Sequence, residues 1–336
     1  MNGMKVEMQP KKNVRKKRKP DNELPVHQCA LYKIGSPKRL ADLLNISTVE
    51  LEVILQSESN YKLFNKVLAP NPFTGKSPKH RAVQEPKPRL RKLHERVLSI
   101  LRRVQYPVYV QGGVKHRSYQ TNAAIHLGAR QTATFDLKNF YASTRYCLVH
   151  DFFHKSMCCP SDIAGRLASL TTWNGVMPTG SPLSPLLSFW AAKGLFDKCE
   201  ALAIKYGLNF TCYIDDLTFS GDQISGRFQS ELKILASRFG YELAKEKTKI
   251  FRFGVPAHIT GVISHKAKLS VPHARLKGAR KIKDAIEGKG KAYGFTAAQL
   301  KKKLAGAINE AATIDAVKYE KWAVYSRKDA EDQFNK

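Results

Sequence analysis

Two adjacent aspartates, Asp215 and Asp216, interrupt the apolar and aromatic run FTCYIDDLTFSG at 210–221. The run predicts a strand, a tight turn and a returning strand, and a buried carboxylate without a partner costs several kcal/mol. A third carboxylate, Asp136, closes the strand-like ATF at 133–135. If the two strands are antiparallel neighbours, the carboxylates meet at one sheet edge. A pair of Mg²⁺ ions, bound in part through substrate phosphates, would offset their repulsion there. The alternative is an ordinary hairpin that uses Asp-Asp in its turn.

The charge of the chain favours a polyanionic partner. Among 336 residues, 57 Lys and Arg face 28 Asp and Glu, which leaves a formal charge of +29. Residues 1–20 hold eight of the basic side chains and one Glu, and 266–304 hold twelve against Asp284 and Glu287. A basic tail that merely aids solubility therefore explains only part of the excess. Phosphate neutralisation and counterion release are the physical reasons to expect nucleic acid.

Other compositional features exclude several classes of protein. Hydrophobic residues make up 43% of the chain and aromatic residues 10%, which is typical of a folded protein. No 18-residue apolar run and no apolar segment behind the basic N-terminus occurs, so we expect neither membrane spanning nor secretion. The six cysteines form no CxxC pair, which predicts reduced thiols in a cytoplasmic protein.

Helix and strand signals divide the chain into three parts. KKNVRKKRKP at 11–20 lacks periodicity and predicts a mobile arm, and capping residues before 37 and 48 predict two short helices. Prolines across 69–88 predict loop and strand, and the segment after them has helical apolar spacing with basic residues opposite. The expected elements beyond it are a strand near 132–136, helices at 161–172, 184–206 and 224–240, strands at 247–253 and 258–264, and helices at 272–287, 296–311 and 315–334.

Three ordered motifs resemble those of reverse transcriptases. YIDD at 213–216 resembles their Tyr-x-Asp-Asp motif, FDLKNFYAS at 135–143 their first palm motif, and MPTGSPLSP at 177–185 their Pro-Gln-Gly-x-Pro-x-Ser-Pro loop. NAAIH at 122–126 and ITG at 259–261 are similar to two elements of bacterial retron enzymes, with Ile in place of Val in the second. The resemblance covers roughly 60–265.

The resemblance implies an α+β fold, a right-hand polymerase with fingers, a palm and a helical thumb. The palm would be a small antiparallel sheet with helices behind it. The expected parts are a basic mobile arm at 1–22, N-terminal helices and fingers at 23–131, a palm at 132–264 with a remaining fingers segment near 145–175, and a basic helical thumb at 265–336.

Carried over residue by residue, Asp136 and Asp215 would be metal ligands, with the Leu137 carbonyl near the second ion. Asp216 would complete the acidic cluster, more as an electrostatic and structural member than as a constant ligand. The implied cofactor is two Mg²⁺ ions, with Mn²⁺ able to substitute, and the implied reaction is nucleotidyl transfer.

Two further positions concern the incoming nucleotide. Tyr141 falls where the family has an aromatic steric gate that excludes a ribose 2′-hydroxyl, although packing beside Phe140 would also explain it. Gly180 suits a loop whose backbone approaches the nucleotide or templating base closely, because it lacks a Cβ. Thr179 departs from the more usual Gln, so template contact from that position is not implied.

Basic positions complete the expected nucleotide site. Lys79 and Arg81 match residues that grip the triphosphate, as a point charge and a planar fork respectively. Lys247 and Lys249 both lie where the family has a lysine near pyrophosphate. Spacing does not decide between them, Lys247 is slightly favoured, and a solvated lysine pair is the alternative.

The retron-type elements imply RNA recognition by Asn122, His126, Thr260 and Gly261. Taken alone, His126 is more often a satisfied structural histidine, and HITG equally fits a plain strand and turn. The resemblance is the only ground for the RNA role.

The function implied is that of a retron reverse transcriptase, an RNA-directed DNA polymerase. It would use dNTPs and a dedicated structured non-coding RNA, as template and as primer source through an internal 2′-hydroxyl. The product would be branched RNA-linked single-stranded DNA (msDNA), and the setting antiphage defence with an effector protein. Alternatives are a group II intron or diversity-generating reverse transcriptase, although no maturase or Cys/His nuclease segment follows the thumb, and a non-catalytic RNA-binding protein on a polymerase-like scaffold.

Overall fold

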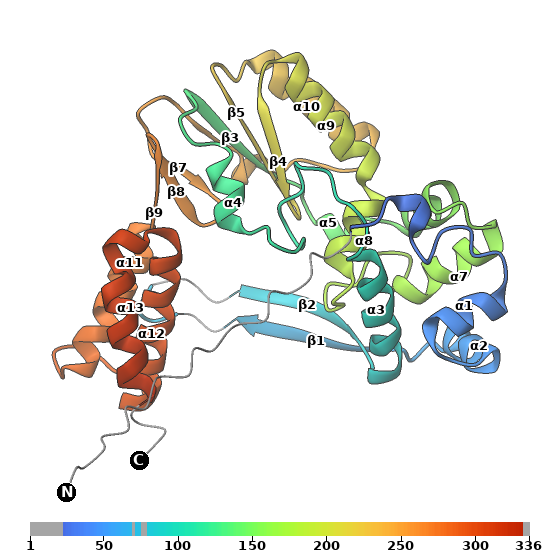
Figure 1. Cartoon of the computed structure of the whole chain (residues 1–336), viewed down its shortest axis with the longest axis horizontal. Helices are drawn as coiled ribbons and strands as arrows, with labels where there is room; N and C mark the ends of the chain where they lie inside the picture. The colour runs from blue at the N-terminus through green and yellow to red at the C-terminus, as the bar shows by residue number, and fades with distance from the viewer. Residues whose placement is uncertain (1–22, 69–70, 75–78, 332–336) are drawn as a thin grey trace, which may run out of the picture.

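The structure is a computed structural model that describes residues 23–68, 71–74 and 79–331. The predicted arm at 1–22 lies outside these residues. Helices and small antiparallel sheets alternate along the chain, so the α+β class expected from the sequence is confirmed (Figure 1). In the described part of the chain, no helix is long and apolar enough to cross a membrane.

A four-stranded antiparallel sheet in the order β4-β5-β3-β6 forms the centre. The two aspartate-bearing strands, β3 and β5, are antiparallel neighbours, and their register places Asp136 opposite Asp216 at the end of the pair. Because side chains alternate across a strand, Phe210 and Phe219 face one side, where Phe219 packs on Phe228 of a covering helix. The strands are β3 (Gln131–Asp136), β4 (Asn209–Tyr213), β5 (Asp216–Gly221) and β6 (Lys249–Phe251).

Helices cover both faces of this sheet. The aromatic face carries α9 and α10, and α4 lies over the other face (Figure 1). The predicted single helix at 184–206 is in fact two helices, since the backbone leaves helical geometry at Ala192. The helices are α4 (Tyr119–Ala124), α8 (Ser184–Ala191), α9 (Lys193–Lys205) and α10 (Gly226–Arg238).

The N-terminal helices pack on the same core. Ser36 Oγ accepts a hydrogen bond from Arg39 N (3.3 Å), and Ser47 Oγ accepts one from Glu50 N (3.0 Å), so both predicted N-caps form. The helical stripe expected after the prolines is present and buried. The elements are η1 (Val26–Gln28), α1 (Pro37–Leu44), α2 (Thr48–Gln56), α3 (Pro88–Leu101), α5 (Phe140–Ser143), α6 (Tyr146–Asp151), η2 (Phe152–Ser156), α7 (Ser161–Thr171) and η3 (Lys245–Lys247).

A long hairpin of β1 (Tyr61–Leu68) and β2 (Lys79–Pro86) spans the gap between these helices and the C-terminal ones (Figure 1). Phe73, between the two strands, is 3% exposed. Its ring lies 5.3 Å from that of Tyr293 and packs with Ile282 and Leu300 of the C-terminal helices. The hairpin therefore joins the two ends of the molecule.

The C-terminal part is a small sheet followed by three helices. The helices stand together at one end of the molecule, beyond that sheet (Figure 1). The elements are β7 (Ala257–Ile259), β8 (Val262–His265), β9 (Lys268–Ser270), α11 (His273–Ile286), α12 (Ala297–Ile314) and α13 (Ala316–Glu331). The sequence predicted one strand at 258–264 ahead of basic helices, whereas the structure has β7 and β8 joined by a turn in this range and β9 after them.

Candidate active site

The β4–β5 hairpin places Asp215 in a two-residue turn and Asp216 in the first position of β5. Tyr213 pairs with Asp216, so Ile214 and Asp215 form the turn. Ile214 has φ 63°, a conformation that β-branched residues rarely adopt and that is typical of strained functional turns. A Cβ on Gly112 would lie 2.6 Å from Ile214 N, so Gly112 gives this turn its room. Sequence reasoning missed Gly112, although the Gly pair at 112–113 is a signal for close backbone approach.

The carboxylates lie close enough for their charges to raise the pKa of Asp215 and of Asp216. Burial, followed by the charges of Asp215 and Asp136, raises the pKa of Asp216 to about 7. Burial also raises the pKa of Asp215, where Asp136 adds to the effect and the cations Lys247 and Arg81 oppose it. Leu137 N donates to Asp215 O (3.0 Å), which ties the end of β3 to the turn. The cluster thus carries more negative charge than its surroundings stabilise.

Lys247 supplies the nearest cation. Its Nζ lies 2.9 Å from both carboxylate oxygens of Asp136, and this hydrogen bond raises the pKa of Lys247. Lys249 lies in β6 opposite Thr134 and is exposed. Of the two lysines that spacing could not separate, the structure brings Lys247 to the cluster.

The donor set fits Mg²⁺, although the carboxylates are not gathered around one point. Across the described ranges, no group of three or more His, Cys, Asp or Glu side chains is arranged to hold a metal ion as it stands. Both oxygens of Asp136 face Lys247, whose ammonium group lies where a metal ion bound to Asp136 would lie. Carboxylate oxygens are hard ligands of the kind that Mg²⁺ prefers. A bound divalent ion would also stabilise the ionised form of Asp216, which burial and the neighbouring charges disfavour. To hold an ion, the Asp136 carboxylate would have to release Lys247.

Tyr141 and Arg81 lie beside the same cluster. Burial raises the pKa of Tyr141, the charge of Asp215 adds to this effect, and Arg81 opposes it. The Tyr141 ring also packs 5.8 Å from Phe140, so the structure is compatible with both the gate and the packing role. The side chain of Lys79, the other predicted triphosphate contact, lies outside the described residues.

Gly180 makes its close approach to a strand of the protein. A Cβ at this position would lie 2.7 Å from Gln84 O and 2.8 Å from Val83 Cγ1 of β2. Thr179 Oγ1 donates to Ala82 O (2.9 Å), and Thr179 N donates to Gln84 Oε1 (3.1 Å). The contacts described here thus explain the glycine through packing of its loop on the hairpin.

His94 holds the same loop from behind and was missed by sequence reasoning. It is 1% exposed, its Nδ1 lies 2.6 Å from Ser181 Oγ, and its Nε2 lies 2.8 Å from Leu170 O. A carbonyl only accepts, so Nε2 carries the proton and Ser181 donates to Nδ1. Burial lowers the pKa of His94 to about 4, so the ring is neutral. The available signal was a histidine inside the apolar stripe of α3.

The four residues predicted to recognise RNA lie together, but two of them are inside the protein. His126 is 2% exposed, its ring nitrogens lie 2.7 Å from Ser220 Oγ and from Thr211 Oγ1, and burial lowers its pKa to about 3. Asn122 is fully buried and donates to Thr260 Oγ1 (3.2 Å). Protein groups surround the side chains of Asn122 and His126 in this conformation, and a role of the four residues in RNA recognition stays a prediction.

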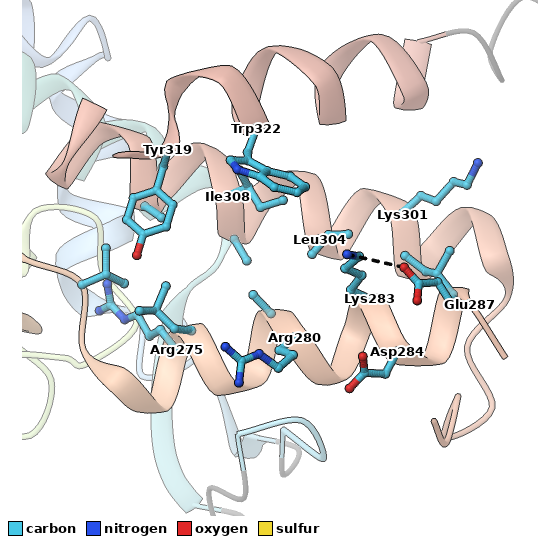
Figure 2. Close-up of a pocket in the computed structure, with 16 residues that line it drawn as sticks. Arg275, Arg280, Lys283, Asp284, Glu287, Lys301, Leu304, Ile308, Tyr319 and Trp322 are labelled. Carbon is cyan, nitrogen blue, oxygen red and sulfur yellow. Dashed lines mark ion pairs between the residues drawn. The ribbon is translucent and has the colours of Figure 1, made fainter. Parts of the chain in front are cut away.

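Helices α11, α12 and α13 form a groove with an apolar floor and charged edges (Figure 2). Its volume is about 800 Å³. Figure 2 shows Arg280 and Lys283 of α11 on one side and Trp322 of α13 on another, and Lys283 Nζ lies 5.7 Å from the centre of the Trp322 ring. Cations beside an exposed aromatic ring suit a phosphate backbone or a base.

Comparison with known proteins agrees with these features. A family model described as "Reverse transcriptase (RNA-dependent DNA polymerase)" matches residues 53–271. The retron Mx65 reverse transcriptase of Myxococcus xanthus is 31% identical over 204 residues, covering 54% of this chain and 47% of the relative. The retron Se72 reverse transcriptase of Salmonella heidelberg is 30% identical over 196 residues, covering 56% and 49%. The retron Ec86 reverse transcriptase of Escherichia coli is 27% identical over 210 residues, covering 61% and 65%.

The chain spans about half the length of the first two of these relatives. The matched range 53–271 covers more than half of the chain and contains the aspartate hairpin, the first palm motif and the MPTGSPLSP loop. The chain therefore belongs to the reverse transcriptase family, and its relatives there include bacterial retron enzymes.

Proposed function

We propose that the chain is an RNA-directed DNA polymerase that extends a primer on an RNA template with deoxynucleotides. The observation that carries the proposal is the carboxylate cluster of Asp136, Asp215 and Asp216. Its excess negative charge is expressed as a pKa of Asp216 near 7. Such a cluster is costly for a scaffold that only binds RNA, and it is useful for two-metal phosphoryl chemistry.

Asp136 and Asp215 would hold two Mg²⁺ ions, with Asp216 beside them and the Leu137 carbonyl near the second. When bound, the ions supply Lewis-acid activation of the primer hydroxyl and neutralisation of the departing pyrophosphate. Lys247, released from Asp136, would then be free to neutralise the pyrophosphate from the same side.

The incoming nucleotide would lie between the β1–β2 hairpin and the carboxylate cluster. Arg81, from β2, would bind the triphosphate through its planar fork, with Lys79 as a second cation. Tyr141 would lie beneath the sugar, where its half-buried ring leaves no room for a 2′-hydroxyl. Gly180 would act indirectly, by letting its loop pack on β2 behind the templating base.

We propose the polymerase parts with the boundaries that the resemblance implies. We assign 23–131 to the N-terminal helices and fingers, 132–264 to the palm with a fingers segment near 145–175, and 265–336 to the thumb. The clustering of the catalytic aspartates on the central sheet supports the palm. The basic groove of α11 and α13 supports a thumb that follows the duplex backbone.

Replacing Asp215 by Asn tests the polymerase proposal. The variant should lose at least about 100-fold in Mg²⁺-dependent DNA synthesis on poly(rA)–oligo(dT), because a ligand and its charge are removed. Asp222→Asn makes the same chemical change at an exposed position after β5 and should keep wild-type activity. Thermal unfolding checks that both variants are folded. Retained synthesis in folded Asp215→Asn would refute the assignment.

We further propose the retron type of reaction, in which a structured RNA is template and primer source and the product is branched RNA–DNA. The supporting observations are the two retron-type elements and the retron relatives. A role in phage defence with an effector protein follows only by analogy. Sequencing the nucleic acid that co-purifies with the protein tests this type. Branched RNA–DNA supports it, intron RNA indicates a maturase, and RNA without cDNA indicates a binding protein.

A further inference from the structure

The NAAIH and ITG segments contact the C-terminal helices in one region, which we call the joint. It consists of α4, the β7–β8 hairpin, Arg275 of α11 and the last turns of α12. Ala123 of α4 and Ile259 and Val262 of the β7–β8 hairpin are buried in one small apolar cluster. Tyr119 and Ile314, at the end of α12, pack against that cluster. The NAAIH and ITG segments therefore lie where the palm sheet gives way to the thumb helices (Figure 1).

Glu310 of α12 is the central acceptor of this joint. Its Oε1 accepts from Arg275 Nη1 (2.6 Å) of α11 and from Tyr119 Oη (3.1 Å) of α4. A second bond from Gln120 Nε2 to Thr313 Oγ1 (2.6 Å) links α4 to α12. One carboxylate thus ties α4 to the consecutive helices α11 and α12, which are far from it in the sequence.

Gly261 makes this arrangement possible. Its φ is +90°, and a Cβ there would lie 2.6 Å from Arg275 Nη2. Thr260 Oγ1 accepts from Asn122 Nδ2 (3.2 Å) and donates to Tyr119 O (3.2 Å). Residues of both elements therefore shape the seat of Tyr119 and Arg275, the two partners of Glu310.

We propose that Glu310, Arg275 and Tyr119 are positioning residues that set the angle of the thumb over the template–primer duplex, and that the NAAIH and ITG elements build their seat. The proposal rests on the proposed polymerase function. Segments joined by small polar interfaces move relative to each other by default, so a few directional bonds at the joint decide how the thumb is held. Figure 2 shows Arg275 at one end of the thumb groove, so a tilt at the joint would move the basic groove.

Two variants test the joint. Glu310→Gln keeps the shape but weakens the charge-assisted bonds, and Tyr119→Phe removes one donor. Dissociation from poly(rA)–oligo(dT), measured with a heparin trap, should be about tenfold faster for Glu310→Gln and about threefold faster for Tyr119→Phe. The rate of the first nucleotide addition at saturating substrate should stay unchanged, because the carboxylate cluster is untouched. Glu320→Gln, at an exposed position of α13, is the matched control.

The outcomes separate this proposal from its rivals. Dissociation of Glu310→Gln equal to that of Glu320→Gln would overturn it. Faster dissociation of the co-purified RNA alone, with unchanged dissociation from poly(rA)–oligo(dT), would also overturn it, because that result indicates direct recognition of the RNA. If the wild type does not extend poly(rA)–oligo(dT), the polymerase proposal fails instead. The proposed role of Glu310 is then tested by hydrogen exchange. Exchange at 257–262 should become faster in Glu310→Gln, and unchanged exchange would mean that Glu310 does not hold the joint.

Discussion

Asp216→Asn should stabilise the metal-free protein while it impairs the polymerase. The pKa of Asp216 rises from an ordinary 3.8 to about 7, which means that the fold disfavours the ionised form. A shift of about 3 units corresponds to at most about 4 kcal/mol at 1.36 kcal/mol per unit. Partial exposure screens this cost, so we expect the variant to gain about 1–2 kcal/mol in free energy of unfolding at pH 8.

The pH dependence has a definite sign. Between about pH 4 and pH 7 the folded chain holds a proton on Asp216 that the unfolded chain has released, so the free energy of unfolding falls as pH rises. The raised pKa of Asp215 acts in the same sense. The advantage of Asp216→Asn should therefore grow from pH 4 to pH 7 and then stay constant.

Urea unfolding in EDTA at pH 5, 6, 7 and 8 measures this advantage directly. Adding Mg²⁺ should stabilise the wild type by mass action and reduce the difference, because the variant has lost a carboxylate from the site. Asp222→Asn should follow the wild type throughout, since that side chain is exposed. An Asp216→Asn variant no more stable than the wild type at pH 8, or equally favoured at pH 4 and pH 8, would refute the electrostatic reasoning.

Three other predictions concern the surrounding structure. Gly180→Ala should lower DNA synthesis at least about tenfold, because its Cβ would meet the β2 backbone at 2.7 Å. The control Gly226→Ala has open space around its Cβ and should keep the wild-type rate. Equal rates for the two variants would contradict the packing role of Gly180. Phe73→Ala should speed hydrogen exchange in α11 and α12, since a buried ring costs about 3–5 kcal/mol to remove, and exchange like that of the exposed control Phe253→Ala contradicts this. Tyr141→Ala should raise ribonucleotide use relative to deoxynucleotide use, and an unchanged ratio removes the gate.

Local signals in the sequence predicted the elements well. Ser36 and Ser47 cap the helices that they were expected to cap, and the aspartate hairpin has the expected strands. These features depend on residues within a few positions of one another, so the printed sequence contains their causes. The break at Ala192 was not predicted, because Ala191 and Ala192 favour a helix and Gly194, two residues further on, was not taken as a signal.

Contacts between distant segments were beyond the sequence. Gly180 meets β2 nearly a hundred positions earlier in the chain, and His94 reaches Ser181 across a similar separation. Spacing could not separate Lys247 from Lys249. The structure does, because η3 carries Lys247 to Asp136 while Lys249 enters the β6 ladder.

The two retron-type elements show what a motif leaves open. Matching NAAIH and ITG to a family implies that their residues matter, and RNA recognition was the role expected for His126. The His126 ring is instead buried between two strand hydroxyls, and a ring enclosed by protein has no surface for RNA. Its position therefore favours a role in stabilising and positioning the scaffold. Asp215 has the opposite environment, a strained turn at a sheet edge among like charges. We therefore infer that His126, buried with partners on both ring nitrogens, stabilises the scaffold, and that the unsatisfied charge of the aspartates is the stronger guide to the chemistry.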